Sequence, residues 1–353
     1  MSLPQTAPAA AAAPAAPTPP RPRALLAMHP QLASHLLDSR SLARLTELAD
    51  LDPLLVVDDF TGPAAAAALA EAEVIVSSWG CPPLDDTVLA AAPRLRAVIH
   101  AAGSVKHHIT DACWQRGIRV ASAAWANALP VAEYTVGAIL FANKQVLRLS
   151  AEYRERRAPY DWPYAESHIG NYRRTVGIVG ASQIGRRVME LLRPYDLELL
   201  LHDPYVDEAE AAALGARSVA LDELCGLSDV VSVHAPELPA TRHLISRRML
   251  ALMPDGATLV NTARGSLIDQ DALIEELVPG RLNAVLDVTT PEVLPADSPL
   301  YDLPNVLLTP HVAGSLGNEL HRMAGAAADE LARYTAGLPF AHPVLPQDIH
   351  RTA

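Results

Sequence analysis

The chain has 353 residues, of which 50% are hydrophobic, so it can bury a sizeable core and fits two domains better than one. Its formal net charge of −12 argues against nucleic acid and anionic membranes as partners. The three cysteines, Cys81, Cys113 and Cys225, stand far apart without Cys-x-x-Cys spacing. We therefore expect neither a disulfide framework nor a metal site.

Residues 1–23 are almost entirely Ala and Pro. This composition cannot bury a core, and its prolines break helices, so we predict a disordered tail. The segment lacks the basic and Leu-rich regions of a signal peptide, and no later apolar run approaches the length of a membrane span. We therefore expect a soluble, cytoplasmic protein.

From residue 24 to about residue 124, short apolar runs alternate with helical patterns, and Pro and Gly stand at the joints. This alternation predicts a small α/β domain with a parallel sheet. The expected strands cover residues 24–28, 54–57, 74–77, 97–101 and 118–121, and the expected helices include 41–49, 63–71 and 87–92.

A Gly-Ser turn and three basic residues follow the strand expected at 97–101. Ligands meet a parallel sheet at the carboxyl ends of its strands, and such a turn can present free N–H groups to a carboxylate. Lys106, His107 and His108 add cationic character to the segment. We interpret Gly103, Ser104 and Lys106 as substrate-binding residues, with a solvated loop as the open alternative.

Apolar side chains recur at helical spacing from Asn127 to about Arg156. A helix of that length exceeds the width of one small domain. We expect a single long helix that leaves the first domain, crosses to the second, and is available to pack against a second subunit.

Residues 175–203 follow the order strand, tight turn, helix, strand, which predicts a mononucleotide-binding βαβ unit. Gly180 and Gly185 let the backbone turn sharply and bring the helix against the strand. The helix N-terminus offers free N–H groups and a positive dipole to a pyrophosphate. Asp203, at the end of the second strand, can accept hydrogen bonds from the adenosine ribose hydroxyls.

Ser182 occupies the position of the usual second glycine in the pattern G-x-G-x-x-G. One interpretation is a degenerate turn that has lost its ligand. We favour the other, in which the hydroxyl donates a hydrogen bond to the phosphate, because Asp203 would otherwise have no purpose at a strand end. The expected cofactor contacts at the start of this helix are therefore Ser182, Gln183 and Ile184.

Polar groups also end the later strands of this second domain, expected at residues 230–234, 258–261, 283–288 and 306–309, with helices at 247–253 and 271–277. Arg264, Glu292 and His311 each follow one of these strands, so one cation, one acid and one imidazole should meet at one rim.

Hydride transfer coupled to proton transfer suits these three groups beside a dinucleotide. Arg264 can clamp a substrate carboxylate or polarise its carbonyl with a planar fork of donors. His311 can give a proton to the forming alkoxide or take it back in the reverse direction. Glu292 can hold the imidazole and favour its charged form. Each residue alone could instead be a surface ion pair, a loop acid or a turn residue.

Together, these motifs resemble the D-isomer specific 2-hydroxyacid dehydrogenases over roughly residues 24–340. The resemblance implies a Rossmann-type doubly wound parallel sheet in an NAD-binding domain of residues 127–314, which includes the interdomain helix. It also implies a smaller, discontinuous flavodoxin-like α/β substrate domain built from residues 24–126 and 315–353. The implied protein is a homodimer that transfers a hydride between NAD(H) and a small D-2-hydroxy acid or 2-oxo acid.

By the same resemblance, Arg264, Glu292 and His311 form the catalytic set, and Asp287 and Ala263 would address the nicotinamide amide. The segment from Gly103 lacks the usual Gly-x-Gly followed by Asp-Asn, so its substrate loop is not a standard one. The remaining positions that the resemblance assigns to the cofactor groove are Pro204, His234, Ala235, Pro236, Thr241, Thr262 and Gly314, with Arg264 and His311 also beside the cofactor.

Alternatives to the dehydrogenase remain. Nicotinamide-sensing corepressors share the fold and the motifs but work by binding a partner, and the sequence alone does not exclude them. Formate oxidation is disfavoured, because that resemblance calls for a Gln where Glu292 stands. Asp203 is followed by Pro204 with no Arg close behind, so we expect NAD rather than NADP, since a carboxylate repels a 2′-phosphate.

Overall fold

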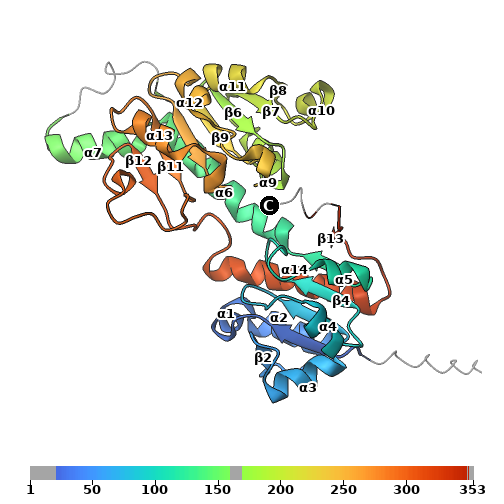
Figure 1. The fold of residues 1–353 in the computed structure, drawn as a ribbon. Helices are drawn as coiled ribbons and strands as arrows, with labels where there is room; N and C mark the ends of the chain where they lie inside the picture. Colours follow the sequence, from blue (N-terminus) through green and yellow to red (C-terminus); the bar gives the residue numbers. More distant parts are fainter. Residues whose placement is uncertain (1–20, 160–168, 348, 350–353) are drawn as a thin grey trace, which may run out of the picture.

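A computed structural model of the chain describes residues 21–159, 169–347 and 349. It contains two sheets, each covered by helices, in two lobes that helix α6 (Ala124–Asn143) connects (Figure 1). The predicted tail lies outside the described residues up to residue 20. Its last part was predicted wrongly, since Arg21 donates to the carbonyl of Thr46 and Arg23 pairs with Asp50.

The first sheet has six strands in the order β13-β5-β4-β3-β1-β2. All neighbours are parallel except β13, which pairs antiparallel with β5. The order 2-1-3-4-5 of its first five strands is that of flavodoxin-like folds, as predicted. The strands are β1 (Ala24–Ala27), β2 (Val56–Val57), β3 (Val74–Ser77), β4 (Ala97–His100), β5 (Arg119–Ser122) and β13 (Pro343–Val344), and the helices α1 (Pro30–Leu36), α2 (Ser39–Leu48), α3 (Pro63–Glu71), α4 (Asp86–Ala91), α5 (Asp111–Gln115) and α14 (Leu320–Thr335).

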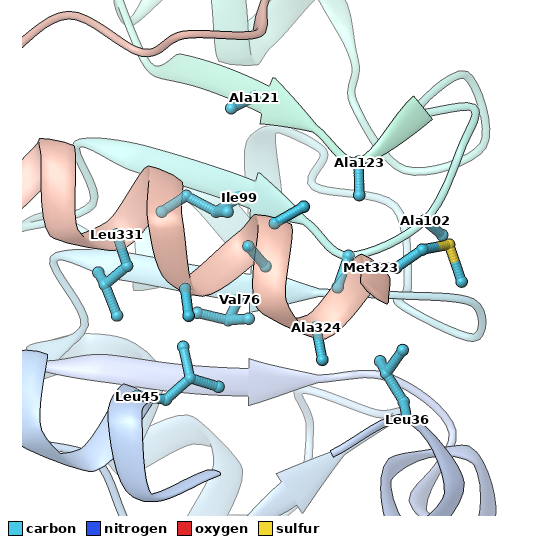
Figure 2. Close-up of a cluster of buried hydrophobic side chains, with 14 of the residues drawn as sticks. Leu36, Leu45, Val76, Ile99, Ala102, Ala121, Ala123, Met323, Ala324 and Leu331 are labelled. Atoms are coloured by element: carbon cyan, nitrogen blue, oxygen red, sulfur yellow. The ribbon is translucent and has the colours of Figure 1, made fainter. Parts of the chain in front are cut away.

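Helix α14 comes from the end of the chain but packs on this first sheet. Its apolar stripe, which includes Met323 and Leu331, is fully buried. Figure 2 shows these side chains among Leu36, Leu45 and Ile99, which come from the first hundred residues. A sheet must bury its apolar faces, so α14 completes a core that the N-terminal segment leaves open.

The second sheet has seven parallel strands in the order β12-β11-β10-β9-β6-β7-β8. The order reverses at β6, as in a doubly wound Rossmann-type sheet, and the crevice at this reversal is where such sheets bind ligands. Its strands are β6 (Arg174–Val179), β7 (Leu197–His202), β8 (Arg217–Ser218), β9 (Val230–Val233), β10 (Thr258–Asn261), β11 (Asn283–Leu286) and β12 (Val306–Leu308), and its helices α9 (Gln183–Leu192), α10 (Glu208–Ala213), α11 (Leu221–Leu227), α12 (Arg247–Leu252) and α13 (Gln270–Leu277).

The prediction of one long helix from Asn127 to Arg156 was wrong. Helix α6 ends at Asn143, and a separate helix α7 (Val146–Arg156) begins three residues later. Gln145, between them, has φ of 48° and ψ of 38°, in the left-handed region. A right-handed helix cannot continue through such a residue, so the chain changes direction there.

Across the parts of the chain that the structure describes, no helix combines the length and the apolar character needed to cross a membrane.

Candidate active site

The turn between β6 and α9 is built on close backbone approach. A Cβ at Gly180 would lie 2.7 Å from the backbone nitrogen of Ala235, and one at Gly185 would lie 2.1 Å from the carbonyl oxygen of Gly180. Gly180 also has φ of +101°, which side chains disfavour. The glycines therefore bring the first turn of α9 against β6 and β9, and its N–H groups face the crevice at the strand ends, where a pyrophosphate would fit.

Ser182 is the N-cap of α9, and its Oγ accepts a hydrogen bond from the Gly185 N–H at 3.3 Å. The serine thus takes one of the N–H groups that the second glycine of the common pattern would leave free. Its hydroxyl proton remains available to donate a further hydrogen bond. Both interpretations of Ser182 stay predictions, but the residue has a structural role that neither of them required.

Asp203 also has a structural role. Its Oδ2 accepts from the Ala181 N–H at 2.7 Å, and its Oδ1 accepts from the Tyr205 N–H at 2.8 Å. The argument that Asp203 would otherwise have no purpose was therefore wrong, because the carboxylate fastens the glycine turn to the end of β7. Each oxygen keeps a further acceptor site, so a ribose hydroxyl can still bind there.

The segment after β9, residues 234–241, was predicted to line the cofactor groove. The structure gives its residues different roles. Burial lowers the pKa of His234 to about 3, and its ring lies 2.8 Å from Ser232 Oγ, so only its backbone is left to face a cofactor. Thr241 donates to the carbonyl of Pro236 at 2.6 Å and accepts from the Leu238 N–H at 2.9 Å. Thr241 therefore shapes the loop. Pro236 is half-buried and Pro204 is exposed.

Thr262 is buried, and its hydroxyl lies 2.9 Å from that of Thr135 on α6. The bond fastens the end of β10 to the connecting helix, and the predicted cofactor contact of Thr262 stays a prediction. Ala263, next along the chain, donates its N–H to Asn261 Oδ1 at 3.0 Å. The Ala263 carbonyl accepts a hydrogen bond from Arg264 Nη1 at 2.6 Å.

Asp287 organises the loop that carries His311. Its buried carboxylate accepts from Thr309 Oγ1 at 2.6 Å and from the N–H groups of Val312 and Ala313 at 2.8 Å each. Tyr134 of α6 extends the network, with its hydroxyl 2.9 Å from Thr309 Oγ1. Oδ1 takes two of these donors and Oδ2 takes one, so Oδ2 keeps an acceptor site, and the predicted contact of Asp287 with the nicotinamide amide stays a prediction.

His311 and Glu292 meet, as predicted. His311 Nδ1 lies 2.6 Å from Glu292 Oε1, and about half of each side chain is exposed. His311 has φ of +55°, a left-handed conformation that costs free energy in a residue with a side chain. Its N–H donates to the carbonyl of Asp287 at 2.9 Å, so the loop holds the strained backbone in place. Glu292 pairs with Nδ1, so Nε2 is the ring nitrogen left outside this bond.

Arg264 lies at the same rim, at the end of β10. Close packing sets its position, because a Cβ at the next residue, Gly265, would lie 2.2 Å from the backbone of Thr289. Sequence reasoning missed a neighbour of Arg264, the exposed acid Glu237. Its Oε2 is 4.0 Å from Arg264 Nε, and its Oε1 accepts a hydrogen bond from Ser266 at 2.5 Å. The signal that the sequence offered for it is an acidic residue directly after Pro236, in the segment predicted to line the cofactor groove.

Lys106 faces this group from the other lobe. The pKa of Lys106 is lowered, chiefly by burial and next by the positive charge of Arg264. The negative charge of Glu237 acts in the opposite direction. The charges of Lys106, Arg264 and Glu237 therefore act on one another between the two lobes.

Asn127, in the helix that connects the lobes, contacts the segment at Ser315 where the chain returns to the first lobe. It was not predicted as a site residue. Its Oδ1 accepts from the Ser315 N–H at 2.9 Å. A Cβ at Gly314 would lie 3.4 Å from that oxygen, and one at Gly103 would lie 3.5 Å from Asn127 Nδ2. The predicted residues Gly103 and Gly314 thus meet around one amide side chain at the base of the cleft.

Comparison with known proteins identifies the class. The NAD binding domain of the D-isomer specific 2-hydroxyacid dehydrogenases matches residues 136–313, which contain the glycine turn, Arg264, Glu292 and His311. The chain belongs to the D-isomer specific 2-hydroxyacid dehydrogenase family.

Individual relatives agree with this. The chain is 33% identical to glyoxylate/hydroxypyruvate reductase B of Pectobacterium atrosepticum, over 79% of this chain and 88% of the relative. It is 34% identical to D-3-phosphoglycerate dehydrogenase of Mycobacterium bovis over 72% of this chain, but it spans only 48% of that relative's length. D-lactate dehydrogenase of Aquifex aeolicus, solved with NAD and lactic acid, has a similar structure, with a TM-score of 0.67 and 26% identity over 89% of this chain and 96% of that one.

Proposed function

We propose that this chain is an NAD-dependent D-2-hydroxyacid dehydrogenase, which interconverts a small 2-hydroxy acid and its 2-oxo acid. The observation that carries the proposal is the 2.6 Å contact between His311 Nδ1 and Glu292 Oε1, beside Arg264 at the strand ends of an NAD-binding sheet. An imidazole held by a carboxylate next to a nicotinamide site is suited to proton transfer coupled to hydride transfer.

NADH, when bound along the crevice at the start of α9, supplies the hydride. Arg264 binds the carboxylate of the 2-oxo acid with its planar fork and so orients the carbonyl. As the carbonyl oxygen gains negative charge, the Nε2–H of His311 donates its proton to it. Glu292 keeps the ring in place through Nδ1 and stabilises its charged form before the transfer. In the reverse direction Nε2 takes the proton from the alcohol.

The substrate loop, residues Gly103–Ile109, is proposed to complete the binding site from the other lobe, within a discontinuous substrate domain of residues 24–126 and 315–353. The burial of α14 and the pairing of β13 with the first sheet support that domain organisation. Lys106 and Arg264 place two cations in one cleft, which supports an acid with a second anionic group as substrate. Glu237 offsets part of this charge.

The test is a screen of small 2-oxo acids, with and without a second anionic group, for oxidation of NADH. Turnover of any of them supports the enzyme. A blank panel together with tight NADH binding would instead support a nicotinamide-sensing protein without catalysis. If the acids with a second anionic group gain nothing in kcat/KM over the simple ones, the second-anion proposal is wrong.

The same screen, repeated with NADPH, tests the choice of cofactor. Asp203 lies beside the expected position of the adenosine ribose, and a carboxylate there favours a diol and repels a 2′-phosphate. We expect a clear preference for NADH in kcat/KM. Equal use of the two cofactors would contradict the proposed contact.

We further propose a cytoplasmic homodimer in which a second copy covers the face formed by α6 and α7. None of the residues of α7, all of which the structure describes, is buried, and Phe141 near the end of α6 is 58% exposed. An apolar hollow of about 320 Å³ lies between them and β10 to β12. Sedimentation should give twice the chain mass of 37.6 kDa, and Phe141→Glu should shift it toward the monomer. A monomeric wild type would rule this interface out.

A further inference from the structure

Three polar side chains are buried together directly beneath the substrate loop. Ser77 ends β3, His100 ends the neighbouring strand β4, and His108 belongs to the loop itself. Ser77 Oγ lies 3.0 Å from His100 Nδ1 and 3.2 Å from His108 Nε2. The exposed fractions of the three residues are 0%, 2% and 3%, so water does not compete for these bonds.

The chemistry of this network defines its arrangement. The hydroxyl of Ser77 has one proton to donate, and it can accept from a ring N–H on the other side. Two neutral histidines of the same tautomer satisfy it, because Ser77 meets Nδ1 of His100 but Nε2 of His108. Two charged rings in these places would repel each other, since the ring centroids are 4.4 Å apart. Burial lowers the pKa of both rings, that of His108 to about 4, and the nearby His107 acts in the same direction on each.

The network is attached both to the sheet and to the loop. Ser77 and His100 are direct partners across the parallel strands β3 and β4, so their positions are fixed by strand pairing. His108 is fixed from a second side, because its carbonyl accepts from the Leu84 N–H at 2.8 Å. His100 Nε2 has no hydrogen-bond partner within the described part of the chain, and the Ser104 backbone is the polar group that acts on the ring from the loop.

We propose that Ser77, His100 and His108 are positioning residues that hold the Gly103–Ser104 turn at its place opposite Arg264. They do not touch the substrate. They act through the substrate loop, whose His108 ring is held by the hydroxyl that it shares with His100. This inference rests on the proposed function for the role of the loop, while the network itself is independent of which acid the enzyme takes.

The matched pair Ser77→Ala and Ser78→Ala tests the proposal in the full chain. Both serines are buried at the end of β3, but Ser78 Oγ donates to the carbonyl of Ala101 at 3.2 Å and does not join the histidines. We expect Ser77→Ala to raise KM for the 2-oxo acid about tenfold, the size of one lost hydrogen bond, with kcat and NADH affinity within twofold of wild type. Ser78→Ala should leave KM unchanged.

Hydrogen exchange of the backbone amides of residues 103–109 tests the same proposal without requiring turnover. These amides should exchange faster in Ser77→Ala than in Ser78→Ala. If the wild type turns over no 2-oxo acid, the proposed function fails while this measurement still decides the positioning role. Equal exchange in the two variants, or equal KM, would overturn the proposal.

A second pair of variants separates positioning from simple packing. His108→Gln keeps a polar group that can reach Ser77, whereas His108→Leu fills the space without a hydrogen bond. We expect Gln to retain a KM near that of wild type and Leu to raise it as Ser77→Ala does. If both substitutions raise KM equally while the protein remains folded, only the shape of the ring matters, and the hydrogen-bonded network is not what positions the loop.

Discussion

His311→Gln is expected to lower kcat for reduction of the 2-oxo acid by roughly 10² to 10⁴, the usual contribution of a positioned general acid. Glutamine has a similar reach and its amide can donate to the Glu292 carboxylate, but it cannot deliver a proton to the carbonyl oxygen. Affinity for NADH should stay nearly intact, because the loop is held by Asp287 rather than by the ring. The measurement is kcat under saturating NADH, with NADH affinity determined separately.

His35→Gln is the matched control for this experiment, since His35 is exposed on α1, far along the sequence from the cleft residues. It should leave kcat unchanged. If His311 only ended a turn, His311→Gln would lower stability or cofactor affinity and leave kcat of the folded, NADH-saturated protein close to wild type. That result would remove the central residue from the proposed mechanism.

Acid should destabilise the folded protein steeply between about pH 6.5 and pH 4. Burial lowers the pKa of His100, His108 and His234 in the folded state, the last two to about 4 and about 3. Each ring is therefore neutral when folded and takes up a proton on unfolding once the pH is below its ordinary value. The stability that these rings contribute is full above that value and falls as the pH falls.

The slope is up to about 1.4 kcal/mol per pH unit for each histidine, so about 4 kcal/mol per unit for the three together. Urea unfolding at a series of pH values measures it through the free energy of unfolding. His234→Gln should remove one histidine's share of the slope, whatever it does to stability at neutral pH. A free energy of unfolding that stays level from pH 7 to pH 5 would contradict the buried neutral state of these rings.

Most of the second sheet could be predicted from the sequence, because six of its strands are apolar runs, whereas the edge strand β8 (Arg217–Ser218) is polar and was missed. The same regularity predicted that Arg264, Glu292 and His311 would stand at strand ends, and the 2.6 Å contact between the latter two follows from it. Local patterns fix which residues end a strand, and parallel pairing then gathers those ends at one edge.

The errors share a physical cause, which is that the deciding contacts lie outside the local pattern. The break between α6 and α7 depends on the left-handed conformation of Gln145, a residue that commonly continues a helix. The role of Asp203 depends on a backbone N–H that is 22 residues away in sequence. Burial of His234 depends on the packing of the whole strand layer, which the motif around Pro236 does not encode.

The return of the chain to the first sheet sets an order for folding during synthesis. All strands of the second sheet, up to β12 (Val306–Leu308), leave the ribosome before α14 (Leu320–Thr335) and β13 (Pro343–Val344). The second lobe can therefore close while the first, although its strands were made earlier, still exposes Leu36, Leu45 and Ile99, the side chains that α14 later covers. An exposed apolar face of this kind promotes aggregation. The N-terminal lobe is thus the last to be finished, although its strands are the first to be made.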